Sequence, residues 1–404
     1  PPPPPPPPFQ AEDGIRDIHC SLVGSEMCIR DRDDTPAYVQ RLKLHPLLGQ
    51  ALEDHVRDHQ GPATPAQAFD DWASVLSNEE RLLRLFGASQ EGLSPDRLRD
   101  ACRWSRARYE DLCAYLAGDR DQDAALDPED DALLLRAWQL RVGPIPGERG
   151  EALRYRHVAI DEVQDFSPNE VRVLLDCIDE HKSLTLAGDT QQHIVQGSGF
   201  TSWESFFTNL GIGGTEISTL QVSYRSSRPI TEFSLAVLGQ ARDPDSQVTT
   251  TREGPAVECF QFTDEGACVA FLSEALIALG DEEPLASIAL LTPSPETSEL
   301  YWRGLSQSEV PRLRHVKEQD FRFSPGIEIT EIEQAKGLEI DYVILLDADD
   351  LNFPDSLAHR RLLHVGATRA IHQLWLMHTS PVSPIVASAM ASARSGNPRS
   401  GERA

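Results

Sequence analysis

The sequence VAIDEVQD at residues 158–165 begins with a short apolar run. Two adjacent carboxylates, Asp161 and Glu162, follow that run at once. Next comes SPNE at residues 167–170, a capping box with proline at the first helical position, which predicts a helix start. A second apolar run at residues 183–187 ends at Gly188-Asp189. A strand, a capped helix and a second strand make a βαβ unit, whose crossover places the two strands side by side and parallel.

The helix of this unit is predicted from its apolar residues, because Val171, Leu174, Leu175 and Ile178 recur at the spacing of one helical face. The carboxyl ends of parallel strands lie on one edge of a sheet, where open α/β folds bind their ligands. We therefore expect the acidic ends of both strands to share a ligand-binding edge.

Asp161 and Glu162 are suited to nucleotide hydrolysis. Mg²⁺ binds proteins through one or two carboxylates while it contacts substrate phosphates, so Asp161 is the candidate Mg²⁺ ligand in the presence of ATP. Glu162 is placed to accept a proton from the attacking water or to orient it. An acidic pair after a strand can also be a solvated loop start or a helix cap, which is the commoner interpretation of an isolated pair.

The composition is that of a protein with two or three domains and no membrane segment. The 404 residues are 40% hydrophobic and 7% aromatic, which is ordinary for a soluble protein. The seven cysteines include no Cys-x-x-Cys pair, which indicates reduced thiols and a cytoplasmic location. The formal net charge of -27 opposes non-specific binding of nucleic acid, so any such contact requires a local basic patch.

Residues 1–32 are set apart from the rest of the chain. The eight prolines at residues 1–8 favour a polyproline II helix, and the residues after them have neither helical nor strand periodicity. Residues 9–32 also resemble translated sequencing-adaptor read-through. On that interpretation the natural protein does not begin here, and the sequence before Asp33 has been lost.

Residues from about 35 to 140 are predicted to be helical, because apolar residues recur there at helical spacing. They contain one basic cluster, which comprises Arg97, Arg99, Arg103, Arg106 and Arg108 with Trp104 and Tyr109 between them. Such a cluster can bind nucleic-acid phosphates and stack a base. The commoner alternative is a solvated helix face that pairs with its own acids, here Asp96, Asp100, Glu110 and Asp111.

The second half of the chain alternates between the two types of secondary structure. Strands are predicted at 257–262, 286–292, 327–332, 341–346 and 373–377, and helices at 264–279 and 356–370. This alternation implies a second, mostly parallel sheet. Residues after about 385 are rich in Ala, Ser, Gly and Arg and are predicted to be frayed.

Five segments, in this order, resemble motifs II to VI of the UvrD/Rep class of superfamily 1 helicases. They are DEVQD at 161–165, GDTQQ at 188–192, YRSS at 224–227, QAKGLE at 334–339 and RLLHVGATRA at 361–370. Five ordered matches are far more specific than any single one. The resemblance covers roughly residues 130–380. It implies an α/β fold with two RecA-like parallel-sheet domains, the first of them incomplete, and an N-terminal helical region.

The implied domain organisation has five parts. Residues 1–32 are an artefact or disordered, 33–150 are the helical region of the first helicase domain, 151–222 the C-terminal part of the first RecA-like domain, 223–384 the second RecA-like domain, and 385–404 a flexible tail.

The resemblance also implies roles for residues of the first domain in binding and hydrolysing ATP. Asp161 would bind Mg²⁺, and Glu162 would activate the attacking water. Gln192 would sense the γ-phosphate and couple it to nucleic-acid binding.

Residues of the second domain would complete the ATP site. Tyr224 would stack on adenine, and Arg225 would reach the γ-phosphate. Glu339, in a loop opened by Gly337, would contact the ribose or the attacking site, and Arg369 would be the arginine finger. Taken singly, Tyr224 could instead be a core residue, Arg225 an ion-pair partner, and Arg369 a charge at a helix C-terminus.

The sequence departs from the family in three respects. No Gly-x-x-x-x-Gly-Lys-Ser/Thr occurs, so the phosphate-binding loop is absent from these residues. VQGSG stands at 195–199 where typical members carry stacking aromatics, with Phe200 and Trp203 as substitutes. Only about 100 residues separate Arg225 from Thr330, a compact second domain that resembles the helicase IV branch, some of whose relatives act on RNA polymerase.

We therefore predict an ATP-dependent DNA helicase or translocase of the UvrD-like type, present as a C-terminal fragment that hydrolyses ATP poorly or not at all alone. ATP binding would close a cleft between the two domains and drive movement on single-stranded DNA. The other partner would be the missing N-terminal part of the same protein. Two alternatives are left open: an ATP-driven motor acting on RNA polymerase, which fits the acidic charge, and a non-enzymatic interaction protein on a helicase scaffold.

Overall fold

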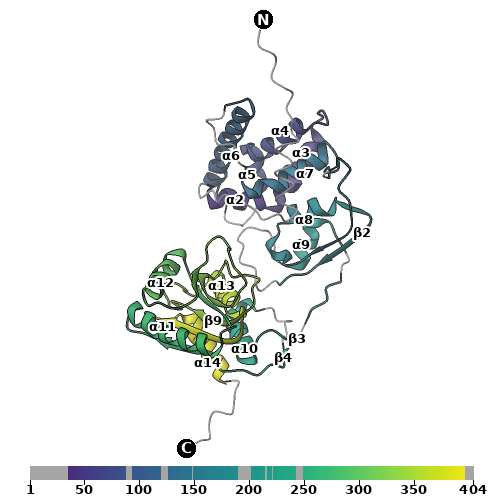
Figure 1. Cartoon of the computed structure of the whole chain (residues 1–404). Coiled ribbons are helices and arrows are strands. Elements are labelled where there is room, and N and C mark those ends of the chain that lie inside the picture. The colour runs from purple at the N-terminus through teal and green to yellow at the C-terminus, as the bar shows by residue number, and fades with distance from the viewer. Residues whose placement is uncertain are drawn as a thin grey trace, which may run out of the picture. The chain divides into compact units, whose positions relative to one another are not determined.

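The computed structural model describes residues 35–87, 93–119, 126–147, 149–189, 202–213, 216–220, 222–242 and 249–395. These residues form two compact units (Figure 1). Unit 1 comprises the described residues up to Asp189 together with 202–213, and unit 2 comprises those from residue 216 onward. Among the helices of the described ranges, none is long and apolar enough to cross a lipid bilayer.

The N-terminal part of unit 1 is helical, as predicted. Its elements are α2 (Ala37–Leu44), α3 (Pro46–Asp58), α4 (Pro65–Leu76), α5 (Glu79–Phe86), α6 (Pro95–Leu116), the short 3₁₀ helix η1 (Pro128–Asp130) and α7 (Asp131–Arg141). Thr64 and Ser94 cap α4 and α6, each followed by proline at the first helical position, because that position needs no amide hydrogen. The apolar faces of these helices share one core, which includes Leu48, Leu52, Trp72, Leu76 and Leu82.

A buried ion group joins the two ends of this helical part. The Nζ atom of Lys43 on α2 lies 2.6 Å from a carboxylate oxygen of Asp127 and 2.7 Å from one of Asp130. Burial alone would lower the pKa of Lys43, but the carboxylates of Asp130 and Asp127 outweigh it, so the pKa is raised. Lys43 therefore keeps its charge and holds α2 against η1.

The rest of unit 1 contains the predicted βαβ unit. It consists of β1 (Tyr155–Ile160), the 3₁₀ turn η2 (Val163–Asp165), α8 (Pro168–Leu175) and β2 (Ile178–Leu186), and α9 (Trp203–Leu210) follows. The strands are parallel, with Val158 opposite Leu184 and Ile160 opposite Leu186. The side chain of Ser167 caps the amide of Glu170, and the Glu170 carboxylate caps the amide of Ser167 in return. The capping box and the parallel pairing are thus confirmed.

One residue of this unit was assigned to the wrong element. Helix α8 ends at Leu175, and Ile178, which the helical spacing placed on its apolar face, is the first residue of β2. At the boundary between two elements, the spacing of a single apolar residue does not show whether it ends the helix or begins the strand. Strand β2 is therefore longer than the predicted run at residues 183–187.

Unit 2 is built on a six-stranded parallel sheet with the strand order β5-β10-β9-β6-β8-β7. Its strands are β5 (Glu258–Gln261), β6 (Ser287–Thr292), β7 (Leu313–His315), β8 (Gly326–Glu331), β9 (Ile340–Leu345) and β10 (Ala370–His378). Two short strands, β3 (Val222–Ser223) and β4 (Thr249–Thr250), pair separately. Strands buried on both faces carry continuous apolar runs, as β6 does.

Helices cover both faces of this sheet. Ala289 and Leu291 of β6 face a core that they share with α10 (Arg228–Leu238), α13 (Leu357–Thr368) and α14 (Pro384–Ser395). Ile288 and Leu290 face the opposite core, which contains residues of α11 (Glu265–Glu282) and α12 (Pro295–Gln307). Figure 1 shows these helices around β9. The predicted α/β fold class with parallel sheets and an N-terminal helical region is confirmed.

The predicted frayed tail is wrong for residues 385–395, and residues 396–404 lie outside the described residues. Residues 384–395 form α14, and Ile385, Val386 and Ala389 on one of its faces are fully buried against the sheet. The Ala/Ser-rich composition suggested disorder, but small residues also let a helix pack closely on its neighbours. Helices α10 and α12 and strand β7 were not predicted from the sequence at all.

Candidate functional site

Asp161 and Glu162 lie at the carboxyl end of β1, as predicted. Asp161 is exposed, and its Oδ1 accepts a hydrogen bond of 2.9 Å from the amide of Glu162. Glu162 has φ +50° and ψ +40°, which is left-handed backbone that residues other than glycine rarely adopt. Such strain is held in place by its surroundings and concentrates at functional sites. Here it turns the chain sharply after Asp161, so that the two carboxylates emerge at the strand end.

Gln164 joins the ends of β1 and β2. Its side chain is fully buried, its Oε1 accepts a hydrogen bond of 2.9 Å from the amide of Asp189, and its Nε2 donates to the Glu162 carboxylate. A Cβ added to Gly188 would lie 2.5 Å from Gln164 Oε1, so any larger residue there would displace the Gln164 side chain. The predicted common acidic edge is therefore present, and a glutamine that sequence reasoning gave no role fixes its geometry.

This edge fits a Mg²⁺ ion that is held mainly by a nucleotide. In the described part of the chain, no group of three or more His, Cys, Asp or Glu side chains is arranged to hold a metal ion. An exposed Asp161 at a strand end supplies one hard oxygen ligand, which suffices when phosphates and waters complete the coordination. The donor set therefore agrees with a metal that arrives with ATP.

In unit 2 the structure brings Arg225 and Glu339 together. Arg225 Nη2 lies 2.7 Å from Glu339 Oε1, and the two side chains are 39% and 54% exposed. Gly337 has φ +81° with open space around its α-carbon, so a side chain there would be strained by the backbone and not by crowding. Tyr224, which is 73% exposed, is not a core residue. Its ring is available to a ligand, whereas Arg225 already has an ion-pair partner.

Arg369 occupies a different environment from the other candidates. It is only 1% exposed, and its guanidinium donates to the carbonyl of Val365 (3.0 Å), the carbonyl of Leu338 (3.2 Å) and Thr368 Oγ1 (3.1 Å). It follows the last residue of α13, where a positive charge complements the helix dipole. The side chain thus has the helix C-terminal role that was the alternative to an arginine finger, and in this arrangement it is not exposed to a ligand.

Several other predictions concern nucleic-acid contacts. Gln192, the segment at 195–199 and Phe200 lie outside the described residues. Trp203 begins α9, is half-buried, and packs against Phe206 and Phe207. It packs against the core of unit 1 with part of its ring.

Two arginines of the basic cluster on α6 pair with acids of the same helix. Arg99 lies 2.7 Å from Asp96, Arg103 contacts Asp100, and the Tyr109 hydroxyl donates to Asp70. These contacts favour the solvated helix face over the nucleic-acid interpretation.

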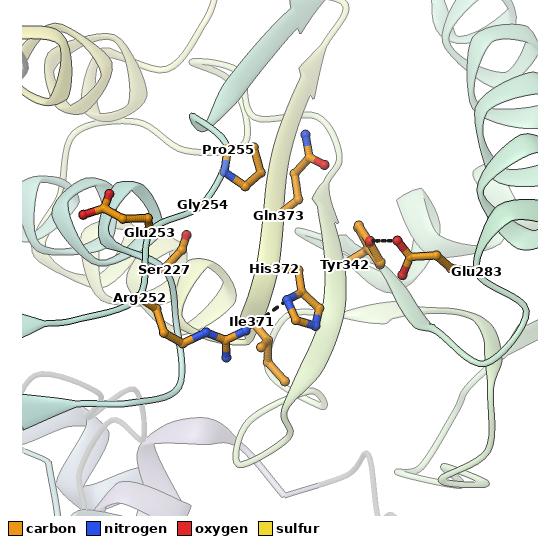
Figure 2. Close-up of a pocket in the computed structure, with 10 residues that line it drawn as sticks. All are labelled: Ser227, Arg252, Glu253, Gly254, Pro255, Glu283, Tyr342, Ile371, His372 and Gln373. Carbon is orange, nitrogen blue, oxygen red and sulfur yellow. Dashed lines mark hydrogen bonds between the residues drawn. The ribbon is translucent and has the colours of Figure 1, made fainter. Parts of the chain in front are cut away.

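A polar cavity of about 240 Å³ lies beside the Tyr224–Arg225 segment of unit 2 (Figure 2). It is lined by Ser227, residues 252–255, Glu283, Tyr342 and residues 371–373. The Tyr342 hydroxyl donates to Glu283 (2.6 Å), and Arg252 lies 3.1 Å from His372. The sequence contained no signal for this site, because its residues come from five separate stretches.

Comparison with known proteins agrees with the motifs. The family of UvrD-like helicase C-terminal domains matches residues 326–377. The chain is 27% identical over 279 residues to the ATP-dependent DNA helicase UvrD2 of Mycobacterium tuberculosis H37Rv, which covers 67% of this chain and 37% of the relative. It is 25% identical over 267 residues to DNA helicase IV of Escherichia coli K12, which covers 57% and 35%. The chain thus spans just over a third of the length of these relatives.

The chain also matches a solved structure, the C-terminal domain of a possible DNA helicase from Lactobacillus plantarum WCFS1. The two are 26% identical with a TM-score of 0.35, and the match covers 41% of this chain and 94% of the solved domain. The ordered motifs, the parallel α/β fold and the matched domain at residues 326–377 agree with one another. Residues 326–377 thus match the UvrD-like helicase C-terminal domain, and the chain is similar to two DNA helicases at 25% and 27% identity.

Proposed function

We propose that this chain is the motor part of an ATP-dependent DNA helicase or translocase. In unit 1, Asp161 contributes the protein ligand to Mg²⁺, and Glu162 orients the attacking water and accepts its proton. When bound, the metal neutralises charge on the phosphate oxygens. In unit 2, Tyr224 stacks on adenine, and Arg225 and Glu339 contact the phosphate and ribose side of the nucleotide.

The observation that carries this proposal is the convergence of three motifs in unit 2. Arg225 pairs with the side chain of Glu339, while Arg369 donates to the carbonyl of Leu338 and accepts from the amide of Ile340 through its own carbonyl. Arg225 and Arg369 are 144 residues apart (369 minus 225) and meet on residues 338–340. A phosphate that binds Arg225 would displace the carboxylate of Glu339. Because residues 338–340 also contact Arg369, this displacement would change the contacts of Arg369.

We further propose that the phosphate-binding loop comes from a part of the protein beyond these 404 residues, which contain no such motif. The exposure of β1 and β2 supports this. Ala159 is exposed and Val158, Leu184 and Leu186 are only half-buried, although parallel sheets normally have both faces covered. Further strands and helices would cover these residues and supply the loop.

Single-stranded DNA is the proposed track, since the relatives carry the names of DNA helicases. The acidic net charge of -27 is the observation that favours the alternative of a motor acting on RNA polymerase. Both alternatives share the ATP chemistry, whereas a non-enzymatic interaction protein would lack it. Nucleotide binding is thus the first property to test.

Replacing Tyr224 by alanine is expected to weaken binding of a fluorescent ATP analogue to the 404-residue chain about tenfold, because base–aromatic stacking contributes roughly 1–3 kcal/mol. The affinity is measured by fluorescence titration with Mg²⁺ present. Tyr224→Phe keeps the ring and should bind like the unchanged chain. The matched control is Leu220→Ala, at a 91% exposed position four residues earlier. Equal affinities of Tyr224→Ala and the unchanged chain would contradict the assignment of Tyr224.

A further inference from the structure

The segment that carries Tyr224 and Arg225 is held by a second segment, residues 249–252. Strand β3 pairs with β4, with Ser223 opposite Thr250. Thr250 Oγ1 donates to the carbonyl of Ser226 (3.1 Å), and the amide of Arg228 donates to the carbonyl of Arg252 (2.7 Å). These contacts lie on both sides of Arg225, so the second segment follows the first along its length.

Arg252 adds a side-chain link to the carbonyl of Arg225 itself. Its Nη1 donates to that carbonyl at 2.8 Å, and its Nη2 lies 3.1 Å from Nδ1 of His372 (Figure 2). Arginine only donates hydrogen bonds, so His372 Nδ1 must accept and its hydrogen must be on Nε2. That nitrogen faces Asp341 Oδ1 at 3.4 Å.

The far end of this chain of contacts is anchored in the sheet. Asp341 Oδ2 accepts hydrogen bonds of 2.9 Å from both the amide and the hydroxyl of Ser287. His372 lies on β10, Asp341 on β9 and Ser287 on β6, which are consecutive neighbours in the sheet. The Arg225 carbonyl is therefore connected through Arg252 to three strands of the rigid core.

The surroundings of Arg252 argue against the cavity beside it as an anion site. Both terminal nitrogens of Arg252 are already engaged, and the carboxylates of Glu253 and Glu283 line the same cavity. A Cβ added to Gly254 would lie 2.5 Å from the Cβ of Ser227, so the backbone is tightly packed next to Arg252. These features fit a guanidinium that orients protein groups.

We propose that Arg252 is a positioning residue that fixes the backbone of Tyr224 and Arg225 and so pre-orients both side chains for the nucleotide. The proposal rests on the proposed function only for the identity of the ligand. Tyr224 is 73% exposed and has little packing of its own, so its direction depends on how its backbone is held. Holding a binding group in its bound geometry raises affinity because less ordering is needed on binding.

The test uses the 404-residue chain without nucleotide. Hydrogen exchange is followed by mass spectrometry on a peptide that covers residues 222–230. In Arg252→Met, the exchange rate of its backbone amides should rise about tenfold, because a charge-assisted hydrogen bond is lost. His372→Leu should have the same effect, while His372→Gln, whose amide oxygen can accept from Arg252, should restore slow exchange. Arg303→Met, which removes an exposed arginine from α12, is the matched control.

The second measurement is the affinity of each variant for a fluorescent ATP analogue. Loss of positioning predicts roughly tenfold weaker binding by Arg252→Met and His372→Leu and near-normal binding by His372→Gln. Unchanged exchange in Arg252→Met would overturn the proposal, and so would faster exchange with unchanged affinity. If the unchanged chain bound no nucleotide, the proposed function would fail, and the exchange data and the glutamine rescue would still decide whether Arg252 fixes the segment.

Discussion

Replacing Glu162 by glutamine is expected to lower ATP turnover of the complete protein by roughly 10²–10⁴-fold, the usual contribution of a general base. Glutamine has the same shape and keeps an oxygen that can accept the hydrogen bond from Gln164 Nε2. The left-handed turn and the common edge of β1 and β2 should therefore persist. Turnover is measured by phosphate release at saturating ATP and Mg²⁺.

Two measurements make this result specific to the chemistry. The affinity of Glu162→Gln for the ATP analogue should stay within about twofold of the unchanged protein, since the water-activating group contributes little to ground-state binding. Glu180→Gln, at an exposed position on β2, should leave turnover unchanged. Turnover by Glu162→Gln within a few-fold of the unchanged protein would show that another group activates the water.

Replacing Arg369 by methionine is expected to destabilise unit 2 by roughly 1–3 kcal/mol, because the carbonyl of Leu338 loses its donor, whereas that of Val365 keeps the hydroxyl of Thr368. The structure gives this reason, since the side chain is 1% exposed and donates to the carbonyls of Val365 and Leu338. Calorimetric unfolding of the 404-residue chain without nucleotide measures the effect.

An arginine finger without a structural role would give a different result. Its removal would leave stability unchanged and lower ATP turnover about 10³–10⁵-fold. Arg303→Met removes a charge that is 68% exposed and part of an (i, i+4) pair, so it should cost no more than about 0.5 kcal/mol. If Arg369→Met were as stable as this control, the hydrogen bonds of the buried guanidinium would not contribute to the fold.

The βαβ unit could be predicted from the sequence because each of its signals is local. The capping box at Ser167 and Glu170, the apolar runs on either side and the glycine before Asp189 lie within about 30 residues of one another. The parallel pairing then follows from the handedness and length of the crossover. The same reasoning placed the parallel strands of unit 2, where apolar runs alternate with amphipathic segments.

The remaining features depend on contacts between distant residues, which local patterns do not contain. Arg369 lies in a motif whose resemblance implies an arginine finger. Its guanidinium is nevertheless buried and donates to the carbonyl of Leu338, 31 residues earlier. The link from Arg252 to His372 spans 120 residues. Helix α14 was missed because alanine and serine permit both a tail and a packed helix, and Ile385 and Val386 find their core only in the assembled sheet.

The measurement that tests the central claim most directly is ATP turnover by the protein encoded by the complete gene, with and without single-stranded DNA. We predict that the complete protein contains a phosphate-binding loop and that single-stranded DNA strongly stimulates its hydrolysis of ATP. A complete gene without such a loop, or a complete protein that turns over no ATP with any nucleic acid, would contradict the helicase account and favour an interaction protein on a helicase scaffold.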